Sequence, residues 1–170
     1  NVRGVWRTIR ASLPQVIENQ GQAVLIASSY AHVNGTLNSS YAVSKSAVEA
    51  LGRGLSVELA AHGASATIAY FGYVKTDLVS EVFDNELADE FREEIAPSFL
   101  TKQITVEQAS GALVDGIEKR AARVIEPRVW RPPFFLRGLL MPLSDRKLEQ
   151  NPRVADFIHR FEARDIQGKK

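Results

Sequence analysis

The sequence predicts an α/β protein in which a parallel β-sheet is covered by helices. Two short apolar runs, Ala23–Ala27 and Ser65–Tyr70, have the length of buried strands and are bounded by turn residues. Between them, apolar residues recur with helical spacing from about Tyr41 to Ala61. An order of strand, long helix and strand is typical of parallel strands joined by a crossover helix.

The other elements follow in chain order. An opening helix is expected to end near Asn19, with a local irregularity at Pro14, whose ring nitrogen cannot donate a backbone bond. A further helix should begin at Thr105 and run through Arg120. Val124–Ile125 is predicted to be a last short strand, and 151–170 an amphipathic helix with a frayed basic end.

Composition sets the class of protein. The 170 residues are 45% apolar with a net charge of +1, which is enough for one core and gives no indication of disorder or nucleic-acid binding. The chain has no cysteine, and its three histidines (His32, His62 and His159) lack metal-ligand spacing, so we expect no metal site and surface or loop positions for these rings. No signal peptide or membrane-spanning run of about 20 apolar residues is visible, which favours a cytoplasmic protein.

Three side chains suggest proton chemistry. Ser28 follows the first apolar run, where ligands bind at the ends of parallel strands. Tyr41 and Lys45 are four residues apart and therefore share one helix face. A nearby ammonium favours a phenolate, so such a tyrosine can exchange a proton with a carbonyl or alcohol oxygen that the serine hydroxyl holds.

This arrangement resembles the active-site half of the short-chain dehydrogenase/reductase family. The family's Tyr-x-x-x-Lys falls on Tyr41 and Lys45, and its serine, thirteen residues before the tyrosine, falls on Ser28, with Ser29 as the alternative. The family's asparagine, which holds a water in a proton relay toward the lysine, falls on Asn1.

A second family motif follows the second strand. Gly72, Val74 and Thr76 match the family's Pro-Gly-x-Val/Ile-x-Thr, with Phe71 in place of the proline. The resemblance implies that these residues, with Tyr41 and Lys45, bind NAD or NADP. It also implies a partial Rossmann-type, doubly wound sheet that holds the last strands of the fold.

The family's glycine-rich pyrophosphate loop has no counterpart here. In the family it precedes the point at which this sequence starts. We therefore expect a C-terminal portion of a longer enzyme, with an incomplete dinucleotide site and one unpaired edge on the strand Ala23–Ser28.

Two later segments concern the substrate. An acidic segment from Asp77 to Leu100 carries apolar residues at helical spacing; in the family this insertion covers the substrate, which favours an apolar ligand, although a buried helical hairpin fits equally well. The stretch 129–143 is apolar with interspersed arginines and is interpreted as a cover for the substrate mouth, or as a peripheral membrane or partner contact. We accordingly divide the chain into a catalytic portion, 1–127, and a C-terminal extension, 128–170.

The sequence thus predicts an NAD(P)-dependent oxidoreductase that interconverts an alcohol and a ketone or aldehyde on a small apolar substrate. The alternatives are a non-catalytic binding or oligomerisation module of the same fold, and an epimerase or dehydratase on the same four residues. Gly52 and Gly54 suggest a close helix approach, either to the sheet or across a dimer axis, so a homodimer or homotetramer is expected.

Overall fold

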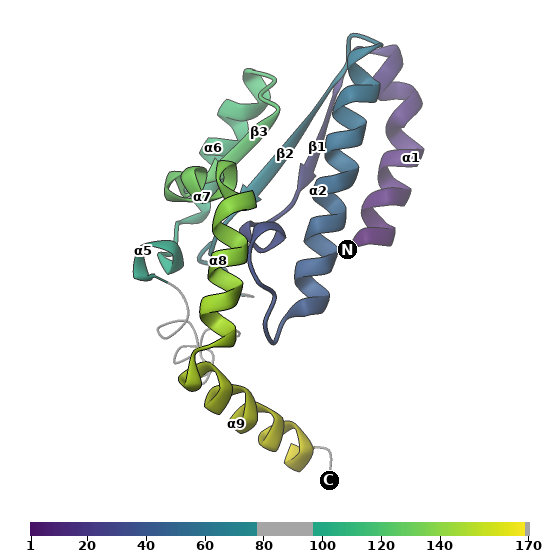
Figure 1. Cartoon of the computed structure of the whole chain (residues 1–170). Coiled ribbons are helices and arrows are strands. Elements are labelled where there is room, and N and C mark those ends of the chain that lie inside the picture. Colours follow the sequence, from purple (N-terminus) through teal and green to yellow (C-terminus); the bar gives the residue numbers. More distant parts are fainter. Residues whose placement is uncertain (78–96, 169–170) are drawn as a thin grey trace.

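The computed structural model describes residues 1–77 and 97–168 (Figure 1). In chain order its elements are α1 (Val2–Glu18), β1 (Gln22–Ile26), η1 (Ser29–His32), α2 (Ser39–Ala60), β2 (Ser65–Phe71), α5 (Ser98–Thr101), α6 (Val106–Glu118), β3 (Arg123–Glu126), η2 (Arg128–Trp130), α7 (Arg131–Phe135), α8 (Arg137–Glu149) and α9 (Pro152–Gly168). The predicted helices and strands occur in the expected order, whereas η2, α7 and α8 form from the stretch after Pro127, for which no helix was predicted.

The three strands form one parallel sheet in the order β1-β2-β3. Leu25 of β1 lies opposite Ile68 of β2, and Tyr70 of β2 lies opposite Ile125 of β3. Among the described residues β1 pairs only with β2, so the expected open edge of this strand is present. Parallel pairing brings the carboxyl ends of all three strands to the same edge of the sheet.

Helices cover both faces of the sheet, as in a doubly wound fold. A Cβ atom at Gly52 of α2 would lie 2.7 Å from Ile68 Cγ1, so α2 packs on the face that carries Ile68. A Cβ at Gly116 of α6 would collide with Val124, which lies opposite Ala69 on the other face. Figure 1 shows α1 beside α2 at the β1 end, and α6 beside β3.

Local sequence accounts for the helix ends. Thr105 begins α6 with a capping box, in which its hydroxyl accepts from the backbone N–H of Gln108 and the Gln108 side chain accepts from the N–H of Thr105. The α1 helix continues through Pro14 to Glu18, one residue before the expected end. The chain then turns at Gln20, whose φ is 48°, and β1 begins two residues later at Gln22.

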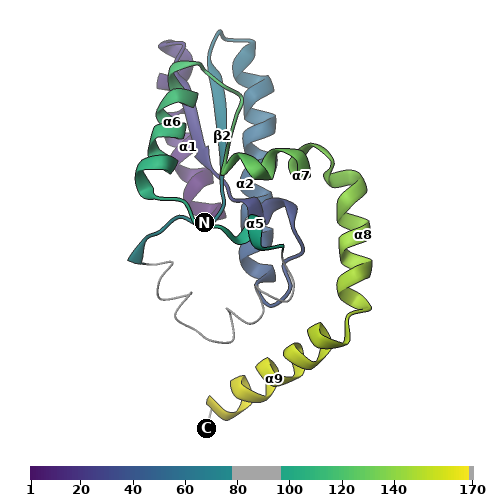
Figure 2. The ribbon, with the colours of Figure 1, turned by 90° about the vertical axis from the view of Figure 1, so that its left-hand side faces the viewer.

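The C-terminal extension is partly built into the core. Trp130 of η2 and Phe134 of α7 belong to the same buried cluster as Leu25, Ile68 and Tyr70. Beyond them α8 and α9 run along one side of the molecule (Figure 2). Most of the expected substrate-covering segment 77–100 lies outside the described residues, which include only its two ends. In the part of the chain that the structure describes, no helix is both long and apolar enough to cross a membrane.

The two glycines of α2 give a paired prediction about stability. Gly52→Ala places a methyl group against buried Ile68, which costs about 1–3 kcal/mol of overpacking and recovers up to about 1 kcal/mol of helix propensity. Gly54 has no atom within 4 Å of its Cβ position, so Gly54→Ala gains the same helix propensity without the overpacking. Chemical denaturation should therefore find Gly52→Ala less stable than Gly54→Ala by about 1–3 kcal/mol; equal stability of the two variants would contradict the close approach of α2 to the sheet.

Candidate active site

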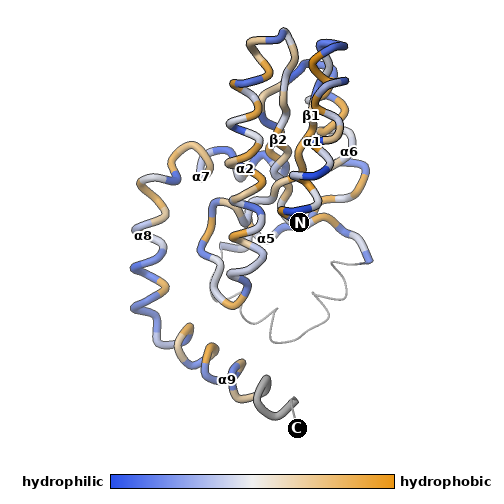
Figure 3. Tube along the Cα trace, turned by 90° about the vertical axis from the view of Figure 1, so that its right-hand side faces the viewer, coloured by the Kyte–Doolittle hydropathy of each residue, from blue (hydrophilic) through white to orange (hydrophobic). Residues whose placement is uncertain are grey.

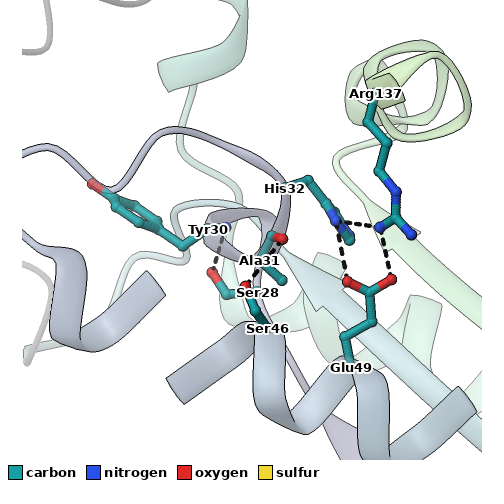
Figure 4. Close-up of polar contacts among 7 residues, drawn as sticks. All are labelled: Ser28, Tyr30, Ala31, His32, Ser46, Glu49 and Arg137. Atoms are coloured by element: carbon teal, nitrogen blue, oxygen red, sulfur yellow. Dashed lines mark hydrogen bonds and ion pairs between the residues drawn. The ribbon is translucent and has the colours of Figure 1, made fainter. Parts of the chain in front are cut away.

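Ser28 lies where β1 has just ended. Its Oγ accepts a hydrogen bond from Tyr30 N at 3.2 Å and so caps the short helix η1 (Figure 4). It also lies 3.4 Å from Phe71 O at the end of β2. The second contact is long for an O–H···O bond, so it holds the hydroxyl hydrogen weakly. Ser28 and Ser29 are both buried, and Ser29 lines the neighbouring cavity described below.

Tyr41 and Lys45 lie one turn apart in the first half of α2 and face the same region. The Lys45 Nζ is 5.5 Å from the centre of the Tyr41 ring and donates a hydrogen bond of 3.1 Å to Ile26 O, the last carbonyl of β1. Partial burial lowers the pKa of Lys45. The Tyr41 and Tyr30 rings pack edge to face, with their centroids 5.4 Å apart. The structure thus brings the serine, tyrosine and lysine to one end of the sheet.

Asn1 lies near this group but without direct contact to it. Its side-chain amide donates to Ser44 Oγ at 3.2 Å, and Ser44 Oγ in turn donates to Tyr41 O at 2.8 Å. The amide therefore reaches the turn of α2 that separates Tyr41 from Lys45, on an exposed part of the surface.

The segment after β2 offers backbone groups to a ligand. Gly72 N donates to Glu126 O, and a Cβ at Gly72 would lie 3.0 Å from Pro127 Cδ, so packing against Pro127 disfavours a side chain here. Val74 forms an isolated parallel bridge with Ile104 through Tyr73 O and Lys75 N. The N–H and C=O of Val74 itself therefore point to the opposite side of the segment. Thr76 is exposed.

A cavity of about 160 Å³ opens beside η1. Its wall is mostly apolar and is drawn from four parts of the chain: η1 and the loop after it (Ser29, Tyr30, Val33, Asn34 and Thr36), the segment after β2 (Tyr73), α5 and its start (Pro97, Leu100 and Thr101), and the extension (Trp130, Pro133, Met141, Ser144 and Leu148). Tyr30 lies between this cavity and the Tyr41 ring.

A buried ion cluster includes the last residue of η1, the short helix that Ser28 caps. Arg137 Nη1 of α8 is 2.7 Å from Glu49 Oε1 of α2 and 2.7 Å from His32 Nδ1 of η1, and His32 Nδ1 is 3.3 Å from Glu49 Oε2 (Figure 4). The Glu49 side chain is only 7% exposed. The cluster therefore joins three separate segments through one desolvated carboxylate.

The cluster also sets the state of the His32 ring. A guanidinium can only donate, so Nδ1 accepts from Arg137, and in the neutral ring Nε2 carries the hydrogen. Burial and the Arg137 charge lower the pKa of His32 to about 4, against the opposing effect of Glu49. His32 Nε2, Tyr70 Oη and Trp130 Nε1 are buried without a hydrogen-bond partner among the described residues, and burial also raises the pKa of Tyr70.

Sequence reasoning missed this cluster. His32 lies in the loop after β1, as expected, but it is buried rather than at the surface. The available signal was Glu49, which follows Lys45 by four residues and Tyr41 by eight, so that a carboxylate extends the same face of the helix. No group of three or more His, Asp or Glu side chains in residues 1–77 and 97–168 is placed to hold a metal ion.

Comparisons with known proteins concern the family and the fold. Residues 1–87 match the family model for short chain dehydrogenases. Oxidoreductase UcpA of Salmonella typhimurium and that of Salmonella typhi are each 31% identical to this chain over 87 residues, which are 48% of this chain and 32% of the relative. The aligned part thus spans about a third of the length of these curated relatives.

Solved structures show a similar fold. A gluconate 5-dehydrogenase from Burkholderia cenocepacia J2315, in complex with NADP and tartrate, superposes with a TM-score of 0.60 at 20% identity over 72% of this chain and 48% of its own. A short-chain dehydrogenase from Streptomyces avermitilis superposes with a TM-score of 0.55 at 23% identity over 91% of this chain and 59% of its own. The Rossmann-type fold is therefore confirmed.

The low pKa of His32 predicts how stability changes with pH. Between pH 6.5 and about 4 the unfolded chain binds a proton at this ring while the folded chain does not, so the free energy of unfolding falls as the pH is lowered through this range. The expected loss is on the order of 2 kcal/mol after partial solvent screening. Denaturation at several pH values should show a smaller slope for His32→Gln, which keeps an acceptor for Arg137 but does not titrate; an unchanged slope would contradict a neutral buried His32.

Removal of the arginine should be costly. Arg137→Met leaves the buried Glu49 carboxylate without its strongest partner, for an expected loss of about 2–4 kcal/mol, since the arginine itself is one-third exposed. The double variant Glu49→Gln/Arg137→Met removes the uncompensated charge and should be more stable than Arg137→Met alone. If the losses in free energy of unfolding of Glu49→Gln and Arg137→Met simply add in the double variant, the two side chains are not coupled.

Proposed function

Because the chain belongs to the short-chain dehydrogenase family, we propose that it supplies the catalytic part of an NAD(P)-dependent oxidoreductase that interconverts an alcohol and a ketone or aldehyde. The observation that supports the proposal is that Ser28 comes just after β1, while Lys45, 5.5 Å from the centre of the Tyr41 ring, bonds to the last carbonyl of the same strand. Ligands of open parallel sheets bind at this edge.

The residues present fit a nicotinamide nucleotide. The bond to Ile26 O uses one of the three ammonium hydrogens of Lys45, which leaves the others to hold ribose hydroxyls. The outward N–H and C=O of Val74 offer a donor and an acceptor together, as a carboxamide requires, and Thr76 follows with a hydroxyl on the exposed side. When bound, the nicotinamide supplies or accepts the hydride, and the protein positions it.

The chain's own residues handle the proton. Tyr41 gives a proton to the substrate oxygen during reduction and takes one during oxidation, and the Lys45 ammonium at its ring stabilises the phenolate that results. The Ser28 hydroxyl donates to the same oxygen as negative charge develops on it, since its contact with Phe71 O is long. Asn1 reaches the intervening turn through Ser44 and is proposed to order a relay water toward Lys45.

The cavity supports a small apolar substrate. Its walls are largely aliphatic and aromatic, with a few polar groups such as Asn34 and Thr36. Trp130 and Met141 of the extension form part of the wall, so we assign the cavity-facing residues of the stretch 129–143 a covering role on the substrate side.

Self-association belongs to the same proposal. Val43 and Val57 on the outer side of α2 are 68% and 77% exposed, and Gly54 presents open backbone between them. An apolar, glycine-bearing helix face of this kind suits a second copy of the chain, in a homodimer or homotetramer.

The first test concerns the tyrosine. In the whole protein, Tyr41→Phe should retain NADH or NADPH binding, followed by nicotinamide fluorescence, and should lose about 10²–10⁴-fold in kcat because the proton donor is absent. Turnover by Tyr41→Phe at the parent rate would refute the assignment. Failure of the parent protein to bind either nucleotide would favour the alternative, a non-catalytic module that retains the fold.

The two serines can be separated directly. Ser28→Ala should lower kcat by about 10–10³-fold, because a donor to the developing oxyanion is lost. Ser29→Ala changes the cavity wall and should mainly raise KM. The reverse pattern would transfer the catalytic role from Ser28 to Ser29.

A further inference from the structure

The α8 helix is apolar on two opposite sides. Met141 and Leu148 face inward and line the substrate cavity, and Arg137 faces the body in its ion pair with Glu49. Leu139 and Leu143, half a turn away, are 66% and 61% exposed. An apolar side of a helix is normally covered, and here the body covers only one of the two.

The outward apolar side extends onto the preceding short helix. Phe135 and Leu136, at the end of α7 and the start of α8, are 70% and 52% exposed and directly precede the exposed Leu139 and Leu143 in the chain. We name these four residues the α7–α8 ridge. In Figure 3, α8 forms one margin of the described chain.

The charges around the ridge are mostly positive; Glu149, exposed at the end of α8, is an acidic residue among them. Arg128 and Arg131 stand at its start, and Arg146 and Lys147 stand in the last turn of α8. From position 127 to 144 the sequence contains no Asp or Glu. The first carboxylate after this span, Asp145, accepts a hydrogen bond from Asn34 and is thereby turned toward the body.

This pattern decides between the two occupants that an apolar ridge could have. In a two-fold dimer the same patch meets itself, so the arginines would approach arginines around a shared apolar centre. An anionic lipid surface instead offers headgroups to the cations and acyl chains to the leucines and phenylalanine.

We propose that the α7–α8 ridge docks on an anionic membrane surface, which places the substrate cavity behind α8 next to the bilayer. The helix lies in the interface plane, with the ridge buried among the upper acyl chains and the four cations at the headgroups. An apolar substrate that leaves the lipid then reaches the cavity at Met141 and Leu148, on the other side of the same helix. This last step rests on the proposed function; the docking itself does not.

Flotation of the whole protein with vesicles tests the docking. The protein should float with vesicles of equal parts phosphatidylcholine and phosphatidylglycerol and should remain in solution with phosphatidylcholine alone. High salt should weaken the binding, since it screens the arginines from the headgroups. Leu139→Glu/Leu143→Glu should lower partitioning at least about tenfold, because each leucine loses its apolar burial.

Two further variants serve as controls. Val106→Glu/Val114→Glu places the same two charges on exposed positions of α6 and should float like the parent. Arg131→Gln/Arg146→Gln leaves every ridge residue in place and should lose binding to the anionic vesicles. Equal flotation of the ridge variant and the parent, or no flotation of the parent, would overturn the proposal. If the ridge substitutions halve the mass of the protein in solution without lipid, the ridge is a contact with a second copy instead.

Activity separates this inference from the proposed function. The ridge variant should reduce a short, water-soluble ketone at the parent rate, because its two substitutions lie outside the cavity. Turnover without flotation refutes the docking alone, whereas flotation without turnover refutes the proposed function alone.

Discussion

The hydrogen bond from the Lys45 ammonium to Ile26 O is the interaction on which the site depends. It joins α2 to the last carbonyl of β1, just before the chain reaches Ser28. Partial burial penalises the charged amine, as its lowered pKa shows, and the strand carbonyl offsets part of that penalty. Because this contact holds the first half of α2 at the strand end, Tyr41 and Ser28 belong to the same region although they come from different elements.

The approach of α2 to the sheet makes that contact possible. Gly52 lies two turns beyond Lys45, where any side chain would meet Ile68. The sequence left open whether this glycine served the sheet or a dimer partner; the packing shows that it serves the sheet. Because the middle of α2 lies this close to the sheet, the Lys45 side chain is long enough to reach the carbonyl of Ile26.

One turn after Lys45, Glu49 performs a second joining role. Its buried carboxylate forms an ion pair with Arg137 of the C-terminal extension and lies beside His32 of η1. A buried charge of this kind tolerates little displacement of its partners, because the loss of either contact leaves it unsolvated. The extension is therefore held to the same helix that carries the tyrosine and lysine, and the cavity wall formed by α8 is positioned relative to them.

Much of this was determined by the sequence alone. Apolar runs of strand length, helical spacing and turn residues predicted the order of elements to within a few residues, because these patterns report local backbone preference and burial. The spacing of Tyr41 and Lys45 predicted a shared face, and the alternation of strand and helix predicted that Ser28 would join them. Only the tertiary structure decided the partners of His32, Glu49 and Arg137, which are 17 to 105 residues apart and carry no periodic pattern. The same holds for the two sides of α8: its sequence shows leucines among charged residues, but which leucines are covered depends on how the chain packs against it.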